Sequence, residues 1–245
     1  MFQRIALSIL LVVGFSSNAC VRNFATTNDT TMTDTIHIEI WSDIMCPFCY
    51  LGKRKFEQAL EQFEGKNQVQ IEWKSFQLNP ELVTDTTMSV VDYLCDVKHI
   101  SREQATQMNS HLVQAGKAVG IDYAFEDVVL YNTMLAHRVL HYAKSIGQQH
   151  EAEERFFKAH FSEGKNLDDA QTLLELAEEM KWDKGAVQRV IDTDTHVHEV
   201  YMDLYDAQQL GISGVPFFLF DEKFAVSGAQ DPSVFLEALR EAAEK

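Results

Sequence analysis

Two cysteines separated by two residues, Cys46 and Cys49, are the side chains of this sequence best suited to do chemistry. An alternating apolar run from Ile36 to Trp41 comes just before them and predicts a β-strand. Apolar residues at helical spacing follow them and predict an amphipathic helix over residues 46–64. Two thiols one turn apart, where a strand passes into a helix, are suited to thiol–disulfide exchange.

The two sulfurs should have different roles. Cys46 would lie at the helix N-terminus, where unpaired N–H groups and the positive end of the helix dipole favour a thiolate over a thiol. We therefore predict that Cys46 is the nucleophile. Cys49 is close enough to attack a mixed disulfide on Cys46 and release the substrate, so it is the predicted resolving thiol. Pro47 suits the first helical turn because it has no N–H group.

Metal binding is the main alternative for these thiols. A zinc site made of thiolates usually needs a second pair of cysteines, and Cys20 and Cys95 each stand alone. His137 and His141 have a spacing that can bind a metal, but Arg138 takes the place of the glutamate in an HExxH helix. We expect no metal and no bound cofactor. The two histidines should have structural or hydrogen-bonding roles.

The residues around the thiol pair are assigned by their pattern. Met45, Phe48 and Tyr50 cannot all face inward from one helical turn, so they are candidates for a substrate groove. Lys53 and Arg54 add positive charge nearby, although such side chains usually reach solvent. Aromatic residues in the predicted strands should instead pack in the core. These are Trp73, Phe76, Phe217, Phe218 and Phe220.

A second motif lies far down the chain, where Gly214, Val215 and Pro216 precede an apolar run. A proline can open a strand but cannot lie inside a central one. The pattern therefore predicts a strand over residues 217–220 that begins just after Pro216.

Together these motifs resemble the DsbA-like thioredoxin-fold oxidoreductases, and more narrowly their FrnE branch. The resemblance extends from about Ile36 to the C-terminus, and it is carried by residues 42–53, 76–80, 132–133, 136–138 and 227–230. It implies that the Val215–Pro216 bond is cis and that Pro216 faces the thiols. The implied catalytic residues are then Cys46, Cys49 and Pro216. Such a loop leaves the backbone of Val215 free to pair with an extended substrate.

The predicted fold class is α/β, a thioredoxin fold with a large helical insertion between its βαβ half and its ββα half. Residues 68–77 predict a second strand, parallel to the first by the right-handed crossover rule. A hairpin should follow over residues 217–226, turning at Asp221-Glu222, and Pro232 should open a last helix that ends at Ala243. We assign residues 36–80 and 210–245 to the thioredoxin-like domain and residues 81–209 to the inserted helical subdomain.

Cys95 lies in this predicted insertion, near Val91 and Leu94. The three residues would form an apolar stripe that turns inward, and a lone cysteine in such a stripe is usually a small buried hydrophobe. We expect Cys95 to be buried and to take no part in the chemistry.

Composition limits the classes of partner. The chain has 245 residues, 46% of them hydrophobic, which is ample material for a core. Its net charge of −16 argues against binding to nucleic acid or to an anionic membrane surface.

The N-terminus bears on localisation. Residues 1–19 have the basic start, apolar stretch and small residues of a signal peptide, and residues 20–35 would be a flexible tether. This predicts an exported, periplasmic protein whose mature form has no membrane span. Cys20 directly after Ala19 also allows a lipid anchor. Translation from Met32 is the alternative, and it would leave the protein in the cytoplasm.

The resemblance implies a thiol–disulfide oxidoreductase acting on proteins or low-molecular-weight thiols, with a redox partner protein or glutathione as co-substrate. Oxidase, isomerase and reductase directions all remain open, although Phe48 stands where oxidising relatives often carry a histidine that stabilises the thiolate. Two alternatives are a glutathione-dependent isomerase or transferase, which typically has serine at the position of Cys46, and a non-catalytic, chaperone-like binder.

Overall fold

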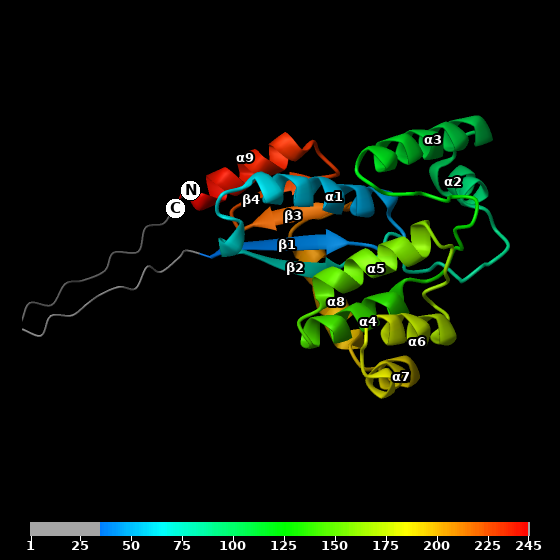
Figure 1. The fold of residues 1–245 in the computed structure, drawn as a ribbon. Coiled ribbons are helices and arrows are strands. Elements are labelled where there is room, and N and C mark those ends of the chain that lie inside the picture. Colours follow the sequence, from blue (N-terminus) through cyan, green and yellow to red (C-terminus); the bar gives the residue numbers. More distant parts are fainter. Residues whose placement is uncertain (1–34, 245) are drawn as a thin grey trace, which may run out of the picture. The chain divides into compact units, whose positions relative to one another are not determined.

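A computed structural model of the protein describes residues 35–244, drawn in colour in Figure 1. The predicted signal peptide, Cys20, the alternative start at Met32 and almost all of the predicted tether lie outside the described residues. Within residues 35–244, no helix combines the length and the apolar character needed to cross a membrane.

The described residues contain four strands, nine α-helices and one short 3₁₀ turn at Lys66–Gln68. The strands are β1 (Ile36–Ser42), β2 (Val69–Ser75), β3 (Phe217–Phe220) and β4 (Phe224–Ser227). The helices are α1 (Pro47–Gln62), α2 (Val90–Lys98), α3 (Arg102–Ala118), α4 (Met134–Ser145), α5 (Gln149–Phe161), α6 (Ala170–Glu179), α7 (Lys184–Asp192), α8 (Val197–Gln209) and α9 (Pro232–Ala243).

The strands form one mixed sheet in the order β2-β1-β3-β4. Strand β1 is parallel to β2 and antiparallel to β3, and β3 forms the predicted hairpin with β4. Successive side chains of a strand point to opposite sides of the sheet, so Ile36, Ile38 and Ile40 of β1 lie on one face and His37 and Glu39 on the other. The parallel pairing of β1 with β2 confirms the prediction made from the crossover rule.

One face of the sheet packs against α1 and α9, which lie on the same side of it in Figure 1. Its core contains Ile38 and Ile40 of β1, Phe56 of α1, Phe218 of β3 and Phe235 of α9. The other face packs against α8 in a smaller cluster. The predicted core roles of Trp73, Phe218 and Phe220 are confirmed, whereas Phe76 and Phe217 are half-buried.

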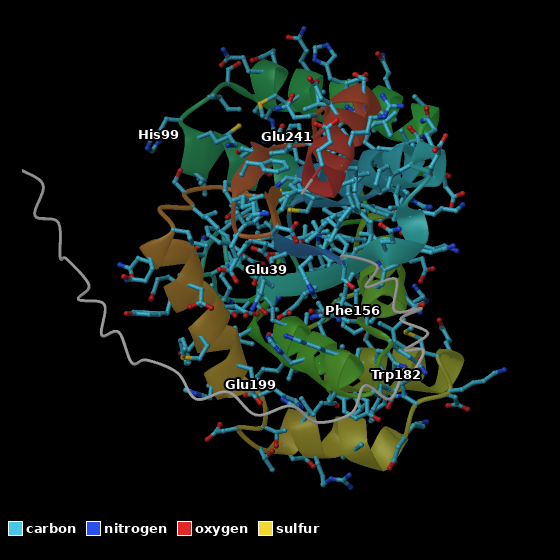
Figure 2. The ribbon with its side chains drawn as sticks, turned by 90° about the vertical axis from the view of Figure 1, so that its left-hand side faces the viewer. Glu39, His99, Phe156, Trp182, Glu199 and Glu241 are labelled. Carbon is cyan, nitrogen blue, oxygen red and sulfur yellow. The ribbon has the colours of Figure 1, made fainter. Side chains whose placement is uncertain are left out.

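Helices α2 to α8 lie between β2 and β3 in the chain, so the fold is a thioredoxin fold with a large helical insertion, as predicted. Phe156 of α5 and Trp182, just before α7, pack with their ring centroids 6.4 Å apart, and Figure 2 shows both among the green and yellow helices of the insertion. The proposed limits of the two parts, at residues 80–81 and 209–210, stay a prediction.

The insertion is not helical throughout. Residues 119–133 contain no helix, and some of their backbone groups bond to distant segments; the N–H of Ala124, for example, donates to the carbonyl of Phe161 at 2.8 Å. Cys95 is half-buried, so the expectation of a buried residue is wrong. Helix α2 has no fully buried residue, because it covers the molecule at one edge and does not enter the core.

Candidate active site

Helix α1 begins directly after Cys46, as the sequence predicts. Cys46 is the N-cap residue and Pro47 is the first helical residue. The N–H of Cys46 donates to the carbonyl of Asp43 at 2.9 Å, and the N–H of Cys49 donates to the carbonyl of Cys46 at 3.0 Å. Both cysteines are free thiols. The turn between β1 and α1 therefore holds the two thiols at the start of the helix.

The two thiols differ in accessibility. Cys46 is 4% exposed and lines a cavity, whereas Cys49 is 0% exposed and does not line it. Burial raises the pKa of the Cys49 thiol well above its ordinary value, and the adjacent Cys46 raises it further. Cys49 is thus a protonated thiol near neutral pH, and a ligand in the cavity meets only Cys46.

The Pro216 loop lies against Cys46. The Val215–Pro216 bond is cis, as the resemblance implied. The Cys46 thiol donates to the carbonyl of Val215, with Sγ and O 3.5 Å apart, although the two residues are 169 positions apart in the chain. The carbonyl of Pro216 accepts the N–H of Gly228 at 2.8 Å, which holds the loop to the end of β4.

Gly52 permits this close approach. A methyl group at its Cα would lie 2.8 Å from the Pro216 ring carbon Cγ. Real Cβ atoms do not come this near to other carbon atoms, so a side chain at position 52 would push helix and loop apart.

A buried carboxylate supports the turn in front of Cys46. Asp43 is fully buried, and its Oδ2 accepts the N–H of Leu78 at 2.8 Å. Its Oδ1 lies 3.4 Å from Nε2 of His137. Burial alone would lower the pKa of His137, but the hydrogen bond to Asp43 and the nearby carboxylates, including Glu153, raise it above its ordinary value.

The histidine pair has the hydrogen-bonding roles predicted for it. His137 pairs with Asp43, and Nε2 of His141 lies 3.1 Å from both Oγ of Ser75 and Oδ2 of Asp203. Across residues 35–244 no group of three or more His, Cys, Asp or Glu side chains is placed to hold a metal ion.

Tyr123 is a neighbour of the thiols that the sequence did not indicate. Its hydroxyl donates to the carbonyl of Pro47 at 2.6 Å. Burial raises the pKa of Tyr123 above its ordinary value, and the nearby Cys46 and Cys49 also raise it. The residue comes from the non-helical stretch 119–133, and no local pattern reveals a contact that spans 76 positions.

Two expectations about the neighbours of the thiols are wrong. Tyr50 is buried, not part of a groove, because its ring stacks on Phe157 with centroids 5.1 Å apart. Lys53 is 1% exposed instead of reaching solvent. Its Nζ lies 2.5 Å from Oε1 of Glu57 and 2.8 Å from Oε2 of Glu154, so its charge is used to join α1 to α5.

The cavity beside Cys46 has a volume of about 310 Å³. Met45 and Phe48 line it, as predicted, together with Val215 and with side chains from α2, α3 and the end of α5. Phe48 is 44% exposed and lines the cavity, which places it at the edge of the cavity.

Comparison with known proteins agrees with this geometry. The family model of a DsbA-like thioredoxin domain matches residues 37–240. The protein YwbO of Bacillus subtilis (strain 168), described as uncharacterized, is 30% identical over 213 residues, which cover 86% of this chain and 99% of YwbO.

Two solved structures are also similar. The crystal structure of the probable DsbA oxidoreductase SCO1869 from Streptomyces coelicolor has a TM-score of 0.81 and 35% identity, covering 86% of this chain and 91% of that one. The structure of 2-hydroxychromene-2-carboxylate isomerase has a TM-score of 0.64 and 17% identity, covering 84% and 94%; at that identity the likeness shows the fold alone. The family match over most of the chain and the relatives at 30% and 35% identity together show that this chain belongs to the DsbA-like thioredoxin-domain family.

Proposed function

We propose that the protein is a thiol–disulfide oxidoreductase in which Cys46 is the nucleophile and Cys49 the resolving thiol. The observation that carries the proposal is the asymmetry of the pair. Cys46 lines an open cavity at a helix N-terminus, while Cys49 is buried behind it with a raised pKa. Membership in a family that consists mainly of oxidoreductases supports the same function.

The exchange proceeds in two displacements. The Cys46 thiolate attacks one sulfur of a substrate disulfide, the substrate S–S bond breaks, and the departing sulfur takes up a proton. Cys49 then loses its proton and attacks Sγ of Cys46, which releases the second substrate thiol and leaves a Cys46–Cys49 disulfide. Two electrons pass from the protein sulfurs to the substrate, and the reverse sequence oxidises two substrate thiols.

Substrate orientation would depend on the Pro216 loop. The N–H of Val215 makes no hydrogen bond with another residue of the described part of the chain. An extended segment that carries the reacting cysteine could therefore add to the loop through this N–H, as a strand adds to a sheet edge. The proposed partners are thiol- or disulfide-containing proteins and a redox partner, either another protein or glutathione.

The test is a set of three cysteine variants assayed for exchange with insulin and with glutathione disulfide. Cys46→Ser should abolish exchange, and Cys49→Ser should accumulate mixed disulfides that mass spectrometry detects on Cys46. Cys95→Ala is the control and should stay within about twofold of the wild type, because Cys95 does not line the cavity. Equal labelling of Cys46 and Cys49 by iodoacetamide near neutral pH would contradict the assigned roles.

The same variants separate the alternative functions. A chaperone-like binder would keep its activity when both cysteines are replaced by serine. A glutathione-dependent isomerase would keep its turnover of a small-molecule conjugate in Cys49→Ser, since that chemistry needs no resolving thiol.

Redox titration of the Cys46–Cys49 pair against glutathione gives the direction of electron flow. A tenfold change in the equilibrium constant corresponds to about 30 mV for this two-electron couple. Because Phe48 stands where a histidine would stabilise the thiolate, we expect a weaker oxidant than relatives with histidine there.

Export is a separate proposal, and it rests on residues 1–19, which lie outside the described residues. Sequencing the mature N-terminus in the native host distinguishes its outcomes. A chain beginning at Cys20 supports export, with lipid on Cys20 indicating an anchor, and a chain beginning at Met32 contradicts it.

A further inference from the structure

The cavity beside Cys46 is mainly apolar. Its walls include Phe48 from the thiol turn, Leu94 from α2, Leu112 from α3 and Phe125 from the stretch between α3 and α4. Its volume of about 310 Å³ lies at the lower end of the roughly 300–1,000 Å³ typical of ligand pockets. A site of this size suits one small molecule.

Asn109 of α3 is the unexpected member of this wall. The residue is 8% exposed, and its side chain makes no hydrogen bond with any residue of the described chain. Its amide atoms are not among the fully buried atoms that lack a partner, so they are open to the cavity and can bond to water or to a ligand there. Asn109 also lines a second cavity of about 670 Å³, so it lies where the two cavities meet. Asn109 therefore offers a ligand in this apolar cavity a neutral hydrogen-bonding group with no partner in the described chain.

The interior of the cavity carries little charge. Burial lowers the pKa of His160, which also lines the cavity, to about 4, so this imidazole is neutral near neutral pH. Its Nδ1 lies 2.9 Å from the hydroxyl of Tyr131. Lys98 is the charged side chain of the lining, and it is exposed. A ligand with several charges would lose hydration here and could gain only Lys98 as a charged partner.

We propose that this cavity binds a small, neutral, amphipathic thiol or disulfide, with its sulfur at Cys46, its apolar body between α2 and α3, and a neutral hydrogen-bonding group such as an amide at Asn109. The inference rests on the proposed function and names its substrate class. Glutathione fits less well, because the exposed Lys98 is the one charged side chain in the wall that could pair with its two carboxylates, and its ammonium group has no acidic partner there. An apolar side chain of a protein substrate would fill the cavity but leave Asn109 unsatisfied.

The electrons balance in a single turnover with such a ligand. The reduced protein supplies two electrons from Cys46 and Cys49, one substrate disulfide is reduced to two thiols, and the protein ends as the Cys46–Cys49 disulfide. No further reductant is consumed.

The experiment measures single-turnover rates of the reduced protein with a set of symmetric disulfides. N-hexanoylcysteamine disulfide should react at least about tenfold faster than N-acetylcysteamine disulfide, because each methylene that enters an apolar site strengthens binding. It should also react faster than glutathione disulfide and insulin. An ester analogue, in which oxygen replaces the amide N–H, should react about fivefold more slowly than the amide, because one hydrogen bond to Asn109 is lost.

Variants of Asn109 test the assigned hydrogen bond. Asn109→Ala and Asn109→Leu should lose the preference for amide over ester, whereas the exposed control Asn67→Ala should keep it. Thermal unfolding of both Asn109 variants should be unchanged or shifted upward, because no hydrogen bond within the protein is removed. An unchanged amide preference in both Asn109 variants would overturn the proposal.

Two further outcomes would also overturn it. One is equal rates for the two acyl chain lengths, and the other is faster reaction of insulin or glutathione disulfide, which would assign the cavity to a peptide segment. Calorimetry with the unreactive S-methyl thioether of N-hexanoylcysteamine distinguishes failure of this binding proposal from failure of the proposed oxidoreductase function. Binding that Leu94→Trp abolishes supports the site even if no disulfide reacts, and absence of binding to the wild type rejects it.

Discussion

At the scale of single residues, Gly52 determines how closely α1 approaches the Pro216 loop. Alanine is normally favoured over glycine in a helix by about 1 kcal/mol. At position 52, however, the added methyl would lie 2.8 Å from Cγ of Pro216. We expect Gly52→Ala to lower the free energy of unfolding by about 1–3 kcal/mol in urea titrations, as overpacking does. Exchange should also slow, because the carbonyl of Val215 moves away from Cys46.

Gly214→Ala is the matched control, since a methyl there meets nothing within 4 Å. Its effect should be neutral or stabilising by less than about 1 kcal/mol. Equal destabilisation by the two substitutions would contradict the close-approach explanation.

Glu153 makes stability depend on pH. The side chain is 3% exposed, and burial raises its pKa to about 7, against the opposing effects of His137 and Lys53. The folded pKa is above the ordinary value of 4.5, so this contribution to stability is full below about pH 4.5 and is lost as the pH rises through about 7. Glu153→Gln should remove this loss. The free energy of unfolding of the variant, relative to that of the wild type, should therefore rise by about 2–3 kcal/mol between about pH 5 and about pH 8.

Chemical denaturation at a series of pH values measures this difference. Glu151→Gln, an exposed change in the same helix, should leave the pH profile as it is. A parallel profile for Glu153→Gln and the wild type would show that the carboxyl group does not ionise in this range.

At the scale of elements, Lys53 fastens α1 to α5 through Glu57 and Glu154. Lys53→Met would leave two half-buried carboxylates without this partner, although Arg54 still pairs with Glu154 and His150 with Glu57. We expect a loss of about 1–3 kcal/mol in the free energy of unfolding, because removing one partner of a buried pair is destabilising.

The matched comparison is Lys66→Met. It removes an exposed ion pair in which Nζ of Lys66 lies 2.9 Å from Oε2 of Glu61, a distance similar to those of the Lys53 pairs. Exposed pairs contribute about 0–1 kcal/mol, so this variant should stay close to the wild type in the same urea titration. A loss at Lys66 as large as that at Lys53 would refute the role given to burial.

The elements also show which features a sequence predicts. The start of α9 was predicted correctly because its signals are local: Pro232 occupies the first turn and the side chain of Asp231 accepts the N–H of Ser233. The thiol turn and the proline motif are likewise short. Asn109 and Tyr123 were missed because their importance comes from packing between segments far apart in the chain, which periodicity does not record.

At the scale of the whole molecule, the last helix is packed against the first. Phe235 of α9 is fully buried, with its ring centroid 4.6 Å from that of Phe218 and 5.7 Å from that of Phe56. Phe235→Ala should destabilise the fold by about 3–5 kcal/mol in thermal or urea unfolding, since it opens a cavity between three elements. Val234→Ala, at a neighbouring residue that is 39% exposed, should change stability by less than about 1 kcal/mol. A cost below about 1 kcal/mol for Phe235→Ala would mean that α9 contributes little to the core.

The separation of 169 positions between Cys46 and Val215 has a consequence during synthesis. A ribosome that adds about 5–20 residues per second needs roughly ten to thirty seconds to make the intervening chain. Throughout that interval the nascent chain carries both thiols of α1 but neither Val215 nor the strand that completes the sheet beside β1. The two thiols of the nascent chain can thus meet oxidants and chaperones before the Pro216 loop is made and the active site is complete.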